Sequence, residues 1–310
     1  MHYRYVTADV FTSQAYGGNP LAVVLDAQGL STEQMQAIAR EFNYSETSFV
    51  LPPKDPEHTA WVRIFTPDRE VPFAGHPNVG TAVVLARELA LAGQTVPDQF
   101  VFEEAAGLVR LSLVTSAKGV EGAELLAPEP LSRGSEASAE AVAHALRLDV
   151  SDIDVSEHAP QVVSVGLAFL VVQLASRDAL RRAAPDASGY AALFPLDGAK
   201  SIYAYTTDTS SDTTDSPTDI QARMFTGRMT EDPATGSATA AATALRAALR
   251  DDGILRLRVG QGVDMGRASL LLAHAEPRSD GVWAGVAGGA VIVMEGVLLA
   301  VEPRQVPMQH

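Results

Sequence analysis

Two stretches of the chain share one pattern of apolar and polar positions. Each begins as an apolar strand with an embedded arginine, Arg63-Ile64-Phe65-Thr66 in the first and Arg223-Met224-Phe225-Thr226 in the second, 160 residues later. A turn and a run of small residues follow in both. A repeat of this kind predicts two copies of one supersecondary unit, each a strand leading into a helix.

The small-residue runs predict helices that begin at Gly75-His76-Pro77 and at Thr235-Gly236-Ser237. Pro77 suits a first helical turn, where its missing N–H leaves no hydrogen bond unmade. Neither helix carries a charge over its first turns, so both are predicted to be buried on all sides, as they would be inside a wrapped sheet. Helix N-termini attract anions. Two such ends facing each other would hold a small carboxylate.

The remaining periodicities predict the same order of hairpin, helix and strand in both halves. The first half has a hairpin over 3–25, an amphipathic helix over 31–42 that opens with the capping box Ser31-Thr32-Glu33-Gln34, and strands over 44–50, 59–66 and 99–115. The second half has helices over 138–148 and 176–183, a hairpin over 162–172, and strands over 201–205, 254–259, 268–273 and 290–301.

Residues 116–130 are rich in Gly, Glu and Pro, which predicts the domain boundary there. We therefore expect an α+β chain with two pseudo-symmetric domains, 1–122 and 123–310. Residues 206–219 are rich in Ser, Thr and Asp, and are typical of a mobile surface loop. A lid over a site is an equally open interpretation of that segment.

Composition narrows the classes of partner. The 310 residues contain 23 Lys and Arg against 38 Asp and Glu, a formal charge of −15, which would repel nucleic acid and anionic membranes. Cysteine is absent, so disulfides, thiolate metal sites and cysteine nucleophiles are excluded. The first residues lack the pattern of a secretion signal, and no apolar run reaches transmembrane length. We expect a cytoplasmic protein without nucleic-acid or membrane partners.

The few polar residues near the two helix starts are the candidates for chemistry. Glu46 is a lone carboxylate at the beginning of a strand, although a solvated glutamate is the commoner case there. His76, Asp232 and Ser237 would each be an ordinary helix cap if considered alone. Their paired placement favours a shared cleft, in which Glu46, His76 and Asp232 surround a carbon next to a bound carboxylate. The strand arginines are expected to pair with carboxylates and to be structural.

Other enzyme classes find no support in the sequence. There is no Gly-x-Ser-x-Gly elbow, no P-loop and no cluster of histidines, so neither a hydrolase nor a metalloenzyme is indicated. The run from Gly260 to Gly266 looks superficially like a dinucleotide fingerprint, but its third glycine is misplaced and no long helix follows. We expect no metal and no cofactor.

Five motifs in order resemble the PhzF-like family of phenazine biosynthesis, and the resemblance covers nearly the whole chain. They are Phe11 with Gly18-Asn19-Pro20-Leu21-Ala22-Val23-Val24, Asn43-Tyr44-Ser45-Glu46-Thr47-Ser48-Phe49-Val50, Phe73-Ala74-Gly75-His76-Pro77, Glu231-Asp232-Pro233-Ala234-Thr235-Gly236-Ser237-Ala238, and Gln261-Gly262 with Met265-Gly266-Arg267. The resemblance implies the diaminopimelate-epimerase-like fold, in which each half is a mixed sheet or half-barrel around a central helix. The tail from about residue 297 would then return to the first half.

The same resemblance implies roles for individual residues. The catalytic acid/base falls on Glu46, with His76 and Asp232 as polar partners of the substrate. At the helix starts, the substrate-binding positions fall on a further set: Gly75, Gly236 and Ser237. The related amino-acid epimerases use two cysteines at these starts, and both are absent here, so two-cysteine stereoinversion is not available to this chain.

The implied activity is a cofactor-free isomerisation of dihydro-3-hydroxyanthranilate by a homodimer, in which one glutamate moves a proton between two ring carbons. Burial is expected to raise the pKa of Glu46 so that it holds the proton between transfers. The alternative is a binding protein that keeps the cleft for a small carboxylate but has no turnover.

Overall fold

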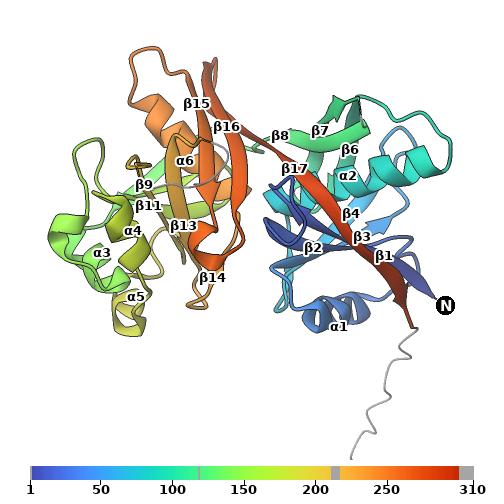
Figure 1. Ribbon diagram of the computed structural model, residues 1–310, viewed down its shortest axis with the longest axis horizontal. Coiled ribbons are helices and arrows are strands. Elements are labelled where there is room, and N and C mark those ends of the chain that lie inside the picture. The colour runs from blue at the N-terminus through green and yellow to red at the C-terminus, as the bar shows by residue number, and fades with distance from the viewer. Residues whose placement is uncertain (1, 118, 211–216, 300–310) are drawn as a thin grey trace, which may run out of the picture.

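The computed structural model describes residues 2–117, 119–210 and 217–299, and shows two lobes of similar construction (Figure 1). In the first lobe, a closed ring of strands surrounds helix α2 (Gly75–Leu91). The ring consists, in order of pairing, of β1 (Tyr3–Val10), β2 (Asn19–Val24), β3 (Glu46–Leu51), β4 (Ala60–Phe65), β6 (Gln99–Glu104), β7 (Gly107–Ser116), β8 (Gly119–Leu126) and the end of β17 (Gly281–Leu298).

The second lobe repeats this arrangement around helix α6 (Gly236–Ala248). Its strands are β9 (Ser132–Glu136), β10 (Gln161–Ser164), β11 (Ala168–Gln173), β12 (Ile202–Thr206), β13 (Ile220–Phe225), β15 (Leu255–Gln261), β16 (Ser269–Arg278) and the beginning of β17. Parallel pairs occupy matching places, β2 with β3 and β4 with β6 in one lobe, β11 with β12 and β13 with β15 in the other. The pairing pattern confirms the duplication and the α+β fold class.

The central helices are buried because their sequences allow close approach on every side. Helix α2 is buried without interruption from Gly75 to Val84. At Gly80, a Cβ atom would lie 2.5 Å from Cδ2 of Leu21 on the surrounding sheet, so a side chain there would collide with the ring. Most of α6 is buried in the same way, and its positions are filled largely by alanine. Apolar residues from helix and sheet form the main core of each lobe.

Shorter helices cover the outside of the rings. They are α1 (Thr32–Phe42) on the first lobe and α3 (Ala139–Leu146), α4 (Arg177–Arg182) and α5 (Ala187–Leu193) on the second, with short 3₁₀ turns η1 (Val150–Asp152) and η2 (Val263–Met265). Two smaller apolar clusters lie beneath them. The capping box of α1 is formed by Ser31 and Gln34 as predicted, and Asn43 ends the helix in the left-handed conformation.

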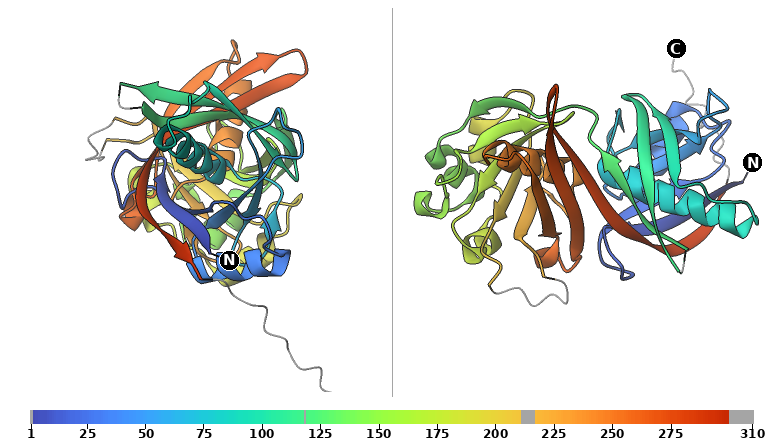
Figure 2. Two further views of the ribbon diagram at one scale, coloured as in Figure 1. Left: turned by 90° about the vertical axis from the view of Figure 1, so that its right-hand side faces the viewer. Right: turned by 90° about the horizontal axis from the view of Figure 1, so that it is seen from above.

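Strand β17 runs through both lobes and joins them (Figures 1 and 2). Its residues 281–287 pair with β16, its residues 285–289 with β8, and its residues 290–298 with β1. The return to the first lobe was expected from about residue 297, and the pairing with β1 begins earlier, at Ala290. Residues 300–310 lie outside the described part of the chain.

Several details differ from the sequence-based expectation. Residues 119–126, inside the stretch whose composition had suggested a domain boundary, form β8, a ring strand paired on both sides. Strand β9 and helix α5 were not predicted at all. The domain limits at 122 and 123 stay a prediction. Of the expected loop or lid over 206–219, residues 211–216 lie outside the described residues.

The two strand arginines have the carboxylate partners that the sequence predicted. Nη2 of Arg63 lies 2.7 Å from Oε2 of Glu70 on β5 (Glu70–Val71), and Nη2 of Arg223 lies 2.7 Å from Oε2 of Glu231 on β14 (Glu231–Asp232). Each arginine forms a second bond to the same carboxylate through Nε. These forked pairs fix the short strand that leads to each central helix.

Candidate active site

The two central helices begin next to each other, at the junction of the lobes. A Cβ atom on Gly75 would lie 3.3 Å from the backbone N of Ser237 and 3.4 Å from Cα of Gly236. Within the described chain, no side chain forms a capping hydrogen bond at either start. The first backbone N–H groups of both helices are therefore available to an anion, as the sequence suggested.

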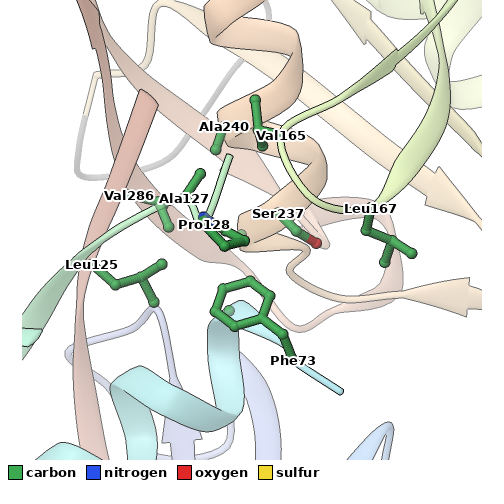
Figure 3. Close-up of a pocket in the computed structure, with 11 residues that line it drawn as sticks. Phe73, Leu125, Ala127, Pro128, Val165, Leu167, Ser237, Ala240 and Val286 are labelled. Atoms are coloured by element: carbon green, nitrogen blue, oxygen red, sulfur yellow. The ribbon is translucent and has the colours of Figure 1, made fainter. Parts of the chain in front are cut away.

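A cleft opens between the lobes at these helix starts (Figure 3). Its empty volume is about 260 Å³, open solvent included, and Gly75, Gly236 and Ser237 contribute to its lining. The other lining residues are all apolar: Phe73, Leu125, Ala127, Pro128, Val165, Leu167, Ala240 and Val286. Helix N-termini and one hydroxyl thus provide the polar groups of an otherwise apolar cleft.

Glu46 is the first residue of β3 and stands beside Leu21 in the parallel pairing with β2. Its Oε2 atom lies 3.2 Å from Nδ1 of His76, the second residue of α2. Burial raises the pKa of Glu46 to about 8, and the charge of Asp232 adds to this rise. One fifth of the Glu46 side chain remains exposed, although Glu46 is not one of the residues that line the cleft.

The contact between Glu46 and His76 requires one proton, because two unprotonated acceptors would repel each other. Burial lowers the pKa of His76 to about 3 and outweighs the opposing effect of the Pro20 backbone. His76 is therefore neutral near pH 7, and the proton between the two residues belongs either to the Glu46 carboxyl or to Nδ1 of His76. The sequence suggested that both residues surround one bound molecule, and in the structure they lie 3.2 Å apart.

Asp232 lies across the junction on β14 and is surrounded by donors. Its Oδ1 atom accepts hydrogen bonds from Oγ of Ser45 and Nδ2 of Asn19, both at 2.9 Å, and its Oδ2 atom accepts one from Oγ1 of Thr235 at 2.5 Å. Burial raises the pKa of Asp232, while these three donors act in the opposite direction. Of Glu46 and Asp232, Asp232 thus has the stronger stabilisation of its charged form by hydrogen bonds.

Four residues of this arrangement were not identified from the sequence. Asn19, Ser45, Thr235 and Gln261 all hold Asp232 or its turn, directly or through one neighbour. Each lies inside one of the quoted motifs, but the sequence analysis assigned no individual role to any of them. Their roles depend on contacts between segments far apart in the chain, which a local pattern does not reveal.

The described residues contain no group of three or more His, Asp or Glu side chains that could hold a metal ion. Among the described helices, none is both long and apolar enough to cross a membrane.

The fold defines the class of α+β proteins with two helix-centred barrels that includes the epimerases. A hydroxyproline epimerase of Agrobacterium vitis shares it, with a TM-score of 0.63 over 96% of this chain and 91% of that one, at 12% identity. The family model described as "Phenazine biosynthesis-like protein" (PhzC-PhzF) matches residues 8–296. The chain therefore belongs to the PhzC-PhzF family, as its motifs indicated.

Relatives of known name agree with this assignment. An uncharacterized isomerase of Mesorhizobium japonicum is 40% identical over 95% of this chain and 98% of its own length. The trans-2,3-dihydro-3-hydroxyanthranilate isomerase of Pseudomonas aeruginosa is 34% identical over 96% and 99%. The Bacillus anthracis phenazine biosynthesis protein of the PhzF family has a TM-score of 0.83 at 26% identity, over 97% of this chain and all of that one. These relatives support a PhzF-like isomerase.

Proposed function

We propose that this chain is a cofactor-independent isomerase in which Glu46 alone moves a proton on a small carboxylated metabolite bound between the lobes. The observation that carries the proposal is the buried Glu46 carboxyl, which lies 3.2 Å from His76 at the start of α2, beside the junction where α2 and α6 meet. The name of the Pseudomonas relative makes a hydroxyanthranilate-like compound the first substrate to try.

Binding follows from the two helix starts. The substrate carboxylate accepts hydrogen bonds from the free N–H groups at Gly75 and Gly236 and from the Ser237 hydroxyl, while the apolar wall of the cleft contacts the ring. The ring carbons next to the carboxylate then lie towards Glu46 and His76. Asp232 provides a fixed negative charge and accepts a hydrogen bond from an amino or hydroxyl group on the substrate.

Proton transfer follows from the pKa of Glu46. A carboxyl with a pKa of about 8 holds a proton near neutral pH and also gives it up readily, which suits a group that both donates and accepts. In its ionised form the carboxylate removes a proton from one ring carbon, and the resulting carboxylic acid delivers that proton to another carbon on the same face, while the double bonds shift between them. Substrate and product therefore have the same composition, and no electron carrier is required.

Proton NMR in deuterated water tests this function. With trans-2,3-dihydro-3-hydroxyanthranilate as the probe, we expect conversion to an isomer and deuterium on the carbon that receives the proton. Binding of the probe, seen as line broadening, without conversion or exchange would contradict the proposal and support the carboxylate-binding alternative. A probe that neither binds nor reacts would exclude hydroxyanthranilate-like substrates.

A further inference from the structure

Gln261, the last residue of β15, has no exposed surface and forms three hydrogen bonds to one turn. Its Oε1 atom accepts from the backbone N of Thr235 at 3.1 Å, and its Nε2 atom donates to the backbone O of Asp232 at 2.8 Å. A backbone N–H can only donate and a carbonyl can only accept, so these two contacts fix the orientation of the amide. The turn between Asp232 and α6 is thereby held from the sheet.

The orientation of Gln261 also determines the direction of the neighbouring hydroxyl. Nε2 of Gln261 lies 3.1 Å from Oγ1 of Thr235 and can only donate to it. The Thr235 hydroxyl accepts this bond and has a single proton of its own, which then faces Oδ2 of Asp232 at 2.5 Å. Gln261, Thr235 and Asp232 therefore form a relay with one direction.

We propose that Gln261 is a positioning residue which, through Thr235, holds Asp232 as the anion of the cleft, so that Glu46 is the acid that carries the proton. Two neighbouring buried carboxyls do not both ionise readily, and the better solvated one ionises first. Asp232 accepts three hydrogen bonds, whereas Oε2 of Glu46 accepts none from the residues that the structure describes. The relay thus selects which of the two acids is ready to transfer a proton.

The other charged groups around this pair do not account for the same selection. Glu46 faces His76 from α2 and Asp232 from β14, and β2 contributes the apolar Leu21. The groups beyond them are held in ion pairs, Glu231 with Arg223 and Asp9 with Arg267, and Tyr44 lies near the second pair. Of these groups, Glu231 acts on the pair, and its charge raises the pKa of Asp232, which opposes the selection of Asp232 as the anion and so does not explain it.

Titration of Glu46 in the ligand-free protein tests the proposal. Carbon-13 labelled glutamate is followed by NMR from pH 5 to 10, and the Glu46 signal is identified by its loss in Glu46→Gln. Thr235→Val keeps the shape of the side chain but removes the hydroxyl, so Asp232 should protonate more easily and Glu46 should titrate about one pH unit lower. Thr235→Ser keeps the hydroxyl and should restore the wild-type titration.

A double-mutant comparison separates a relay from a merely structural amide. Gln261→Met should shift the Glu46 titration in the same direction as Thr235→Val, and should add no further shift in the Thr235→Val background. Additive shifts would show that Gln261 acts by another route and would overturn the proposal. Equal Glu46 titration in wild type and in all folded variants would overturn it as well. If Thr235→Val does not fold, Gln261→Met against Thr235→Ser provides the same comparison.

The inference rests on the proposed function in one respect, the role of Glu46 as the acid that transfers the proton. The titration itself is measured on the ligand-free protein and requires no turnover. Unchanged isomerisation by Glu46→Gln would contradict the proposed function and leave the titration result standing. An unshifted titration in Thr235→Val, together with an inactive Glu46→Gln, would contradict the relay alone.

Discussion

At the scale of single residues, the site depends on a difference in hydrogen bonding between two acids, Glu46 and Asp232. Glu46 has a neutral, buried histidine as its partner, whereas Asp232 is surrounded by donors. The sequence identified Glu46, His76 and Asp232 because they stand next to predicted element starts. It did not identify Asn19 or Thr235 as partners of Asp232. Asn19 is 213 residues away from that acid in the sequence and Thr235 is three residues away. The sequence of a turn does not show whether its short polar side chain forms such a hydrogen bond.

The raised pKa of Glu46 predicts a pH-dependent cost to stability. A carboxyl whose pKa is about 8 in the folded protein and 4.5 ordinarily favours folding at low pH, and this contribution is lost as the pH rises from about 4.5 to 8. Glu46→Gln has no charge to bury, so its free energy of unfolding should rise relative to that of wild type over this window, by about 4 kcal/mol at pH 8. Urea unfolding at pH 5 and pH 8 measures the difference.

Glu104 provides the matched control for that measurement. Burial also raises its pKa to about 8, and it lies on β6 with Asn78 as its polar neighbour rather than His76 or Asp232. Glu104→Gln should therefore gain stability over the same pH window. A difference between variant and wild type that does not change with pH would contradict the assigned protonation states.

Gly75 is expected to be essential for binding, because it allows the two helix starts to approach. A Cβ atom at this position would lie 3.3 Å from the backbone N of Ser237, so Gly75→Ala should separate the two anion-binding ends. We expect the KM for a carboxylated substrate to rise at least about tenfold, since aligned charge-assisted hydrogen bonds are lost. Steady-state kinetics measures this, and an unchanged KM would place the anion elsewhere.

At the scale of elements, the sequence pattern predicted the helices whose position depends on their own residues. The capping box placed α1, and the absence of charge placed α2 and α6 inside the sheet. Strand β9 was missed because all of its residues are exposed and it exists only through pairing with β10. Strand β8 was not predicted within the stretch assigned to the domain boundary, because its Gly and Glu are poor strand formers, and pairing on both sides overrides that preference.

Helix α2 offers a test in which packing and binding are separated. A Cβ atom on Gly80, the sixth residue of α2, would meet the side chains of Leu21 and Val10 at 2.5 and 2.7 Å, whereas no lining residue of the cleft is among its contacts. Gly80→Ala should lower the free energy of unfolding by about 1–3 kcal/mol through overpacking while leaving KM nearly unchanged. Thermal unfolding combined with kinetics distinguishes this pattern from that of Gly75→Ala, which should show the reverse.

At the scale of the whole molecule, the site exists only because both lobes contribute to it. Strand β17 joins the rings, and Asn19 reaches from the first lobe to Asp232 and to the backbone O of Ala234 in the second. The duplication was visible in the sequence, but the juxtaposition of the lobes was not, because no local pattern records how two separate rings face each other. Homodimer formation, implied by the resemblance, stays a prediction that light scattering can test.

Arg267 is expected to stabilise that juxtaposition. Its guanidinium group donates to the backbone O atoms of Gly17 and Gly18, at 2.7 and 2.8 Å, and pairs with Asp9, all in the first lobe. Lysine cannot form this fork, so Arg267→Lys should release the segment that precedes Asn19 and reduce kcat/KM about tenfold. Kinetics and unfolding are compared with wild type. Undiminished kcat/KM would show that the lobes do not depend on this contact.

The central claim is that one buried carboxyl, Glu46, transfers the proton. Its most direct test is the rate of isomerisation of trans-2,3-dihydro-3-hydroxyanthranilate at saturation by wild type, Glu46→Gln and the matched Glu104→Gln. We predict that Glu46→Gln binds the substrate but loses at least about 10³-fold in kcat, whereas Glu104→Gln remains close to wild type. Turnover by Glu46→Gln at the wild-type rate would contradict the claim.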